Sequence, residues 1–189
     1  MNNLNQYKYY LVLDLEATCC DQGAIKKQEM EIIEIGAVMV EAANLTIIDE
    51  FQTFIKPIRN PLLTDFCKSL TSITQAQVDQ AQFYVEAVAL LKKWLSNYGN
   101  AVFGSWGGYD YRQFQQDSKF HNTAFPIAYS HVNLKQLFTA SQGLQKKYGI
   151  AGALTLANIP LEGIHHRGID DAKNIAKLLP YILGRQQLK

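Results

Sequence analysis

Two acidic residues at the end of an apolar run are the side chains in this 189-residue sequence that are best placed to do chemistry. Asp14 and Glu16 end the segment 9–16, which begins Tyr-Tyr-Leu-Val-Leu and is typical of a β-strand. Because side chains alternate along a strand, both carboxylates lie on one face, about 7 Å apart. No lysine or arginine occurs between Lys8 and Lys26, so a hard divalent cation is a natural partner for two buried acids. The alternative is a strand end in solvent, where acids cost little.

A second acidic pair begins the helix that we predict over residues 168–183. At 100° per residue, Asp171 lies on the apolar face of this helix and Asp170 on the polar face. We therefore expect Asp170 to be solvated or to interact with the helix dipole. Asp171 points inward, as a capping group or as a metal ligand. His166, five residues earlier in a loop, has the near-neutral pKa that a base for an attacking water needs, and His165 is the weaker alternative.

A third acid follows a glycine-rich turn. Asp110 begins a predicted helix after the sequence Gly104-Ser-Trp-Gly-Gly-Tyr109. Aspartate is a common helix cap, so capping is the alternative to a role in ligand binding. Trp106 and Tyr109 in the same turn either stack on a base or fill the core.

Taken together, the four acidic residues predict a more specific kind of site than any one of them does alone. Asp14, Glu16, Asp110 and Asp171 each occupy a strand end or a helix start, from which they can converge. Four hard oxygen ligands suit two magnesium or manganese ions about 3.5–4 Å apart, an arrangement that hydrolyses phosphodiesters.

The elements that must position these residues follow an α/β pattern. Three strands come first and are expected to form an antiparallel meander, and helices then alternate with two short strands. The expected strands are 9–16, 30–40, 46–56, 101–103 and 127–132, and the expected helices are 62–70, a short helix capped by Thr74, 83–97, 109–119, 133–142 and 168–183. We predict one domain over residues 1–189, with its core at about 7–184 and a central sheet of mixed strand direction.

Composition narrows the class of protein. Eighteen basic and seventeen acidic residues give a net charge of +1, which is not the strongly basic balance of dedicated nucleic-acid binders. Three cysteines match neither a disulfide framework nor a zinc ligand set, so a reducing cytosol fits best. No signal peptide or membrane-length apolar stretch is present. The sequence therefore predicts a cytoplasmic protein that does not contact membranes.

The ordered acids and their flanking residues resemble the DEDDh branch of the DEDD 3′→5′ exonucleases, and within it the Eri1-like group. The resemblance spans roughly residues 9 to 183. Its main motifs are Asp14-Leu-Glu-Ala-Thr-Cys19, Glu31-Ile-Ile-Glu-Ile-Gly36, Phe54-Ile-Lys-Pro57, Asp65-Phe-Cys-Lys-Ser-Leu-Thr71 and Asp170-Asp-Ala-Lys-Asn-Ile-Ala176. Ser72 departs from the group, which commonly has glycine at this position.

This resemblance implies an RNase H-like fold and a two-metal site that holds Mg²⁺, with Mn²⁺ able to substitute. It implies that Asp14, Glu16, Asp110 and Asp171 hold the metals and that His166 is the general base. It also implies contacts to the terminal nucleotide. The residues that we expect to make these contacts are Ala17, Thr18, Leu70, Thr71, Ile73 and Trp106.

The function expected from these features is removal of nucleoside 5′-monophosphates from single-stranded 3′-hydroxyl ends. RNA is favoured over DNA only because of the subgroup resemblance. Two alternatives are a non-catalytic adaptor that binds RNA ends and a DNA-proofreading-type exonuclease. The sequence does not define the oligomeric state.

Overall fold

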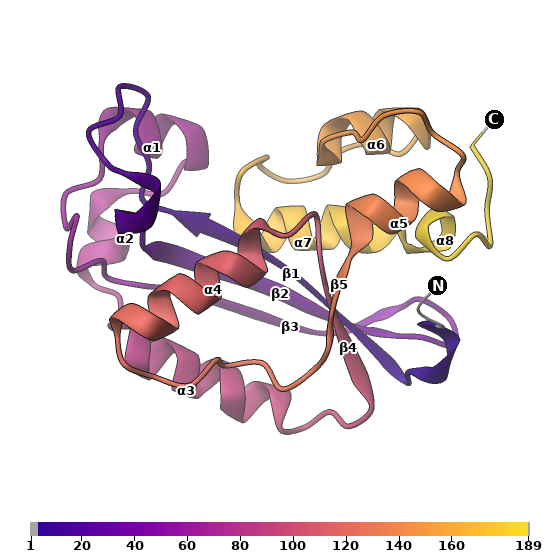
Figure 1. The fold of residues 1–189 in the computed structure, drawn as a ribbon, viewed down its shortest axis with the longest axis horizontal. Coiled ribbons are helices and arrows are strands. Elements are labelled where there is room, and N and C mark those ends of the chain that lie inside the picture. The colour runs from indigo at the N-terminus through magenta and orange to yellow at the C-terminus, as the bar shows by residue number, and fades with distance from the viewer. Residues whose placement is uncertain (1–3, 189) are drawn as a thin grey trace.

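A five-stranded sheet between two layers of helices forms the body of the protein in the computed structural model, which describes residues 4–188 (Figure 1). The elements in chain order are the 3₁₀ turn η1 (Leu4–Gln6), β1 (Tyr9–Ala17), the 3₁₀ turn η2 (Lys27–Glu29), β2 (Ile32–Glu41), β3 (Ile47–Phe54), α1 (Asp65–Thr71), α2 (Gln75–Asp79), α3 (Tyr84–Leu95), β4 (Ala101–Ser105), α4 (Tyr109–Phe120), β5 (His131–Asn133), α5 (Leu134–Ser141), α6 (Ile150–Leu156), α7 (Gly168–Lys177) and α8 (Leu179–Ile182).

The sheet has the strand order β3-β2-β1-β4-β5. β1, β2 and β3 form the expected antiparallel meander, while β4 pairs parallel to β1 and β5 parallel to β4. The predicted α/β fold with a mixed sheet is therefore confirmed. β1 is the central strand, and its end carries the first two acids.

Alternation along β1 divides the core as the sequence predicted. Tyr10 and Val12 face the layer formed by α5, α6, α7 and α8. Leu11, Leu13 and Leu15 face the layer formed by α3 and α4. Asp14 and Glu16 thus project on the side of the sheet that α7 covers, which is where the C-terminal acids come from.

Four elements differ from the expectation. The strand expected at 127–132 is only His131–Asn133, because β4 offers just three register partners to it. The long C-terminal helix ends at Lys177, since Pro180 has no N–H to continue the hydrogen-bond ladder; Pro180 lies in the first turn of the separate helix α8, which begins at Leu179. The helix Ile150–Leu156 was not predicted, because its sequence is almost uniformly apolar and lacks a polar face. Gly104 does not end β4, which continues to Ser105.

A backbone contact brings α7 against the sheet. A Cβ atom placed on Gly36 of β2 would lie 2.0 Å from the backbone carbon of Gly168, the first residue of α7. Gly36 is also the register partner of Asp14. Only a residue without a side chain fits at this position, so the start of α7 is held directly beside the end of β1.

The three cysteines form no disulfide among the described residues. Cys19, Cys20 and Cys67 are free, and Cys67 is buried with its Sγ 3.7 Å from the carbonyl oxygen of Ala17. Cys19 is partly buried and packs against the same small cluster. Within residues 4–188, no helix has both the length and the apolarity that crossing a membrane requires.

Ser72 ends α1 in a left-handed conformation, with φ 58° and its N–H bonded to the Lys68 carbonyl. Since glycine adopts this conformation without a Cβ clash, Ser72→Gly should raise the free energy of unfolding by about 1 kcal/mol in urea denaturation. Ser69→Gly, at an exposed position inside the same helix, is the matched control and should lower it by about 0.5 kcal/mol. Equal destabilisation by both changes would contradict strain at Ser72.

Candidate active site

Four acidic side chains from three separate elements meet beside the end of β1. Carboxylate oxygens of Asp14, Glu16 and Asp171 all lie within 4.8 Å of one another. Asp110, in the first turn of α4, is held beside β1, because its Oδ1 accepts the N–H of Leu15 at 3.2 Å. Leu15 lies between Asp14 and Glu16 in the sequence. The side chains of Glu16, Asp110 and Asp171 are nearly inaccessible, at 8%, 4% and 2% exposure. Glu16, Asp110 and Asp171 are therefore not exposed to solvent, and Asp171 also accepts the backbone N–H of His166, as a capping group would.

Burial and mutual repulsion dominate the electrostatics of this cluster. Burial raises the pKa of Asp14 well above its usual value, and the neighbouring Asp110 and Glu16 carboxylates raise it further. Burial and the nearby Asp171 raise the pKa of Glu16 to about 9. Burial also raises the pKa of Asp110 to about 6. Holding these groups ionised together at neutral pH is unfavourable unless a positive charge lies among them.

The donor set fits a hard divalent cation. All the oxygens of the cluster are carboxylate oxygens, the ligand type that magnesium and manganese prefer. A cation in their midst would also offset the repulsion that raises the pKa of Asp14 and Glu16. The residues present are thus suited to the metal that the sequence predicts.

Glu34 and Arg167 hold the start of α7 in place. The fully buried carboxylate of Glu34 accepts the N–H of Gly168 at 3.1 Å, the Arg167 Nε at 3.0 Å and the Gln52 amide at 2.6 Å. This pair fixes the helix end that carries Asp171. Glu34 thus supports the site from behind, without belonging to the carboxylate cluster. Arg167 was missed because nothing but its position beside His166 distinguishes it.

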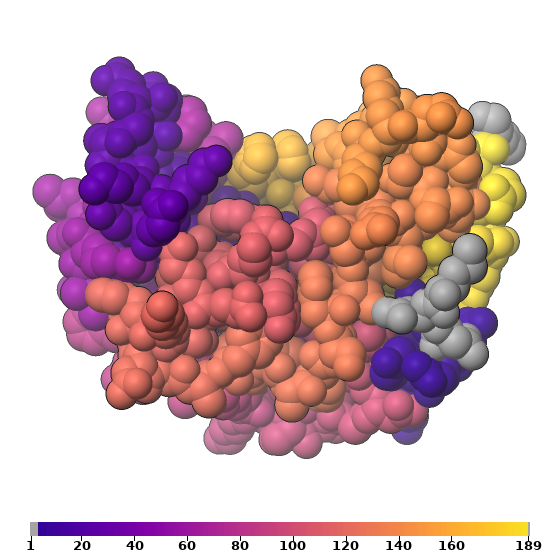
Figure 2. All heavy atoms as spheres, viewed as in Figure 1, coloured from indigo at the N-terminus to yellow at the C-terminus, as the bar shows by residue number. Residues whose placement is uncertain are grey.

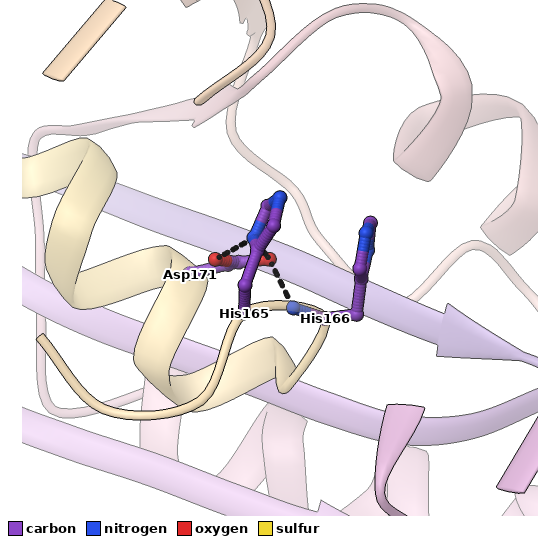
Figure 3. A group of neighbouring side chains, drawn as sticks. All are labelled: His165, His166 and Asp171. Carbon is purple, nitrogen blue, oxygen red and sulfur yellow. Dashed lines mark hydrogen bonds and ion pairs between the residues drawn. The ribbon is translucent and has the colours of Figure 1, made fainter. Parts of the chain in front are cut away.

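The two histidines before α7 both contact Asp171 (Figure 3). The Nδ1 atom of His165 lies 3.0 and 3.1 Å from the two Asp171 oxygens. His166 donates its backbone N–H to Asp171 at 3.0 Å, and its ring stacks on His165 with centroids 4.0 Å apart. Burial, followed by the neighbouring His165, lowers the pKa of His166, so its imidazole is neutral at pH 7 and able to accept a proton.

Asp170 organises the loop that carries these histidines. Its Oδ2 accepts the N–H of Ile164 at 2.8 Å, and its carboxyl group packs where a side chain on Gly163 would stand. Asp170 is partly exposed and lies outside the carboxylate cluster, as the helical phase predicted. Its role is local, because it fixes the loop conformation.

The assignment of Trp106 to substrate binding is corrected by the structure. Trp106 is 7% exposed, packs against Phe138 and donates its indole N–H to the Tyr148 carbonyl at 3.0 Å. It fills the core, which was the alternative. Gly107, with φ 127°, lies in the turn after Trp106, and Tyr109 beyond it is 40% exposed. Burial, followed by the neighbouring Asp110, raises the pKa of the Tyr109 hydroxyl, so this end of the side chain lies towards the acids.

The other residues predicted to contact a nucleotide lie around α1 and the end of β1. Thr18 is buried and exchanges two hydrogen bonds with the Glu31 backbone, at 2.8 and 3.0 Å. Thr71 and Ile73 are also buried, whereas Leu70 is partly exposed. Ala17, the last residue of β1, is buried. In the space-filling view, the surface is hollowed between the indigo residues at the upper left and the orange residues of α5 and α6 at the upper right (Figure 2).

Comparison with known proteins gives a consistent result. A family model described as "Exonuclease" matches residues 11–179. ERI1 exoribonuclease 3 of Mus musculus is 31% identical over 95% of this chain and 55% of its own length, and the 3′-5′ exonuclease eri1 of Schizosaccharomyces pombe is 29% identical over 91% and 67%. The solved nuclease domain of 3′hExo, a DEDDh family member bound to rAMP, superposes with a TM-score of 0.84 at 28% identity, over 95% of this chain and 93% of that one. The chain thus spans roughly half to two thirds of the length of these two curated relatives.

Metal binding should stabilise the protein strongly. Mn²⁺ at 100 times its dissociation constant should raise the free energy of unfolding by about 2.7 kcal/mol, or about 5–10 °C in Tm, because the unfolded chain has no such site. Thermal denaturation with Mn²⁺ and with chelator measures this difference.

Without metal, the free energy of unfolding should fall as the pH rises. A carboxylate in a stabilising ion pair would have the opposite effect. Glu16 ionises near pH 4.5 in the unfolded chain and near pH 9 in the folded protein, so the stability present below pH 4.5 is lost as the pH rises towards 9. Glu16→Gln should flatten this loss and weaken the response to Mn²⁺. A metal-free protein that becomes more stable over this pH range would contradict the repulsive cluster.

Proposed function

The chain belongs to the exonuclease family that its residues 11–179 match, within the DEDDh, Eri1-like group, and on that premise we propose that it is a metal-dependent 3′→5′ exonuclease. It hydrolyses phosphodiester bonds from a free 3′-hydroxyl end and releases nucleoside 5′-monophosphates. The observation that carries the proposal is the convergence of Asp14, Glu16 and Asp171 within 4.8 Å, with Asp110 beside them.

These four acids would hold two Mg²⁺ ions, for which Mn²⁺ can substitute. When bound, such ions activate a water and stabilise the charge that develops on the phosphate. The contribution of the protein is to hold the carboxylates in place. β1 fixes two of them, the Gly36–Gly168 contact fixes α7, and the Leu15 N–H orients Asp110.

His166 is the general base of the proposed reaction. Its position five residues before Asp171 matches the family motif, its loop is tied to Asp171 by a backbone hydrogen bond, and its lowered pKa leaves it neutral at pH 7. It would take a proton from the attacking water. His165 is the neighbour whose ring lies against Asp171.

The proposed substrate is a single-stranded 3′ end, with RNA preferred. This preference is supported by relatives that are named as exoribonucleases and by a structural relative described as recognising the 3′ end of a histone mRNA stem-loop, which has a TM-score of 0.84 at 26% identity over 97% of this chain and 67% of that one. Ala17, Thr18 and the segment 70–73 would surround the terminal nucleotide, with Leu70 and Tyr109 offering the accessible apolar surfaces.

A 3′-labelled single-stranded RNA distinguishes the proposal from an adaptor function. The protein should release labelled mononucleotides with Mg²⁺ or Mn²⁺ and none with chelator, and a matched DNA strand should be cut more slowly. Asp171→Asn should fold normally and lower the rate at least about 100-fold, because it removes a cluster carboxylate. Asp170→Asn, which keeps an acceptor for Ile164, is the control and should stay within about threefold. Tight RNA binding without metal-dependent release would favour an adaptor, and equal or faster DNA cleavage would favour a DNA-directed enzyme.

Substitutions of the two histidines should change kcat by different amounts. His166→Ala should lower kcat by about 10²–10⁴-fold, the usual contribution of a general base, while the Mn²⁺ dissociation constant changes little. His165→Ala should have a smaller effect on kcat, since its ring contacts Asp171 and is not the proposed base. Rapid-quench cleavage assays and Mn²⁺ titration measure the two quantities. If His165→Ala caused the larger loss of kcat, the base would be assigned to the wrong residue.

A further inference from the structure

An imidazole nitrogen faces both oxygens of the Asp171 carboxylate, in addition to the backbone N–H of His166. The Nδ1 atom of His165 lies 3.0 Å from one Asp171 oxygen and 3.1 Å from the other (Figure 3). The His166 N–H reaches only Oδ2, at 3.0 Å. Asp171 is 2% exposed, so water hardly competes with these two nitrogens. The proposed reaction gives this contact of His165 no task.

The chemistry of a carboxylate fixes which atom donates in the contact with His165. An ionised carboxylate, the form that binds a cation, has no proton and only accepts hydrogen bonds. The Nδ1 atom of His165 must therefore carry a proton and donate it to Asp171. Among residues 4–188, no other group donates to the Asp171 side chain, so its Oδ1 keeps a lone pair that the protein does not use.

The loop before α7 leaves the His165 ring little freedom to turn away. This ring stacks on that of His166, with centroids 4.0 Å apart and planes inclined by 24°. His166 has φ 64°, a left-handed conformation that residues with a Cβ rarely adopt. The Arg167 N–H donates to the Ile164 carbonyl at 3.2 Å and closes the turn around both histidines. The turn thus presents a ring nitrogen and a backbone N–H to the same carboxylate.

Two donors together restrict the rotation of the Asp171 carboxylate. The last side-chain torsion of an aspartate has broad preferences, so the residue does not set the plane of its own carboxylate. Contacts with both oxygens from His165, and with Oδ2 from His166, do set this plane. Loss of a partner behind a metal-binding side chain typically costs about 10–100-fold in metal affinity or activity.

We propose that His165 is a positioning residue that holds the Asp171 carboxylate in the orientation in which it binds a cation. This inference rests on the proposed function, since it assigns Asp171 to metal binding. It adds to the four acids and the general base a residue that acts through Asp171 alone. The essential feature of His165 is its Nδ1–H donor, and the ring serves to hold that donor in place.

Two substitutions of His165 separate the donor from the ring. His165→Asn places an amide nitrogen close to the position of Nδ1 but has no ring, whereas His165→Phe keeps a ring beside His166 but has no donor. His165→Phe should raise the Mn²⁺ dissociation constant by about 10–100-fold, while His165→Asn should stay within about threefold of the wild-type protein. A role in packing alone predicts the reverse order, with Phe tolerated and Asn damaging.

Ile164→Ala is the matched control for disturbance of the loop. The Ile164 side chain is 49% exposed, and its substitution leaves the backbone hydrogen bonds of residue 164 in place. This variant should bind Mn²⁺ as the wild-type protein does. Free Mn²⁺ measured by electron paramagnetic resonance during titration gives the affinity of each variant, and circular dichroism melting shows whether each variant folds.

A second measurement needs no folded His165→Phe variant. Long-range ¹H–¹⁵N NMR of the wild-type protein with Mg²⁺ reports which ring nitrogens carry protons. The His165 signals are assigned by their loss in His165→Asn. The expected result is a proton on Nδ1, because only this atom faces the Asp171 oxygens.

Three results would overturn the assignment of His165. These are an Nδ1 atom without a proton, equal Mn²⁺ affinity in folded His165→Phe and His165→Asn, and tighter Mn²⁺ binding in His165→Phe. The last would mean that His165 competes with the cation for Asp171. A wild-type protein that binds Mn²⁺ but cleaves no nucleic acid would refute the proposed function and would leave these affinities and the NMR result readable. The two failures are therefore distinguishable.

Discussion

Repulsion between buried carboxylates is the constraint that the rest of the structure must satisfy. Asp14, Glu16 and Asp171 are brought within 4.8 Å, although burial and mutual charge oppose their ionisation. Packing elsewhere has to stabilise this arrangement. Two apolar layers on the faces of the sheet do so, since each contains a large set of fully buried side chains. The site is therefore held together by the scaffold and not by attraction among its own members.

The clustered carboxylates are positioned by contacts of neighbouring residues that do not belong to the cluster themselves. The glycine pair 36 and 168 lets α7 touch the sheet backbone, and Glu34 bonds the helix start from within β2. These contacts use backbone groups and a buried ion pair, so they vary little with side-chain motion. Such rigid support is what an electrostatically catalysed reaction requires, because its donors must be in position before the substrate arrives.

Periodicity made the central part of the site predictable. The two-residue repeat of β1 placed Asp14 and Glu16 on one face, and the helical phase separated buried Asp171 from partly exposed Asp170. The resemblance to known exonucleases correctly indicated the family and the fold.

Features set by long-range geometry were not predictable in this way. The path of the glycine-rich turn includes the positive φ of Gly107, and it leaves Trp106 in the core and Tyr109 partly exposed. The contact of Arg167 with Glu34 joins residues 133 positions apart, and no local pattern signals it. Among the described residues, α7 follows every strand of the sheet, so Asp171 reaches the carboxylates of β1 only after the whole sheet has been synthesised. An N-terminal fragment that stops before α7 therefore lacks one of the three clustered carboxylates.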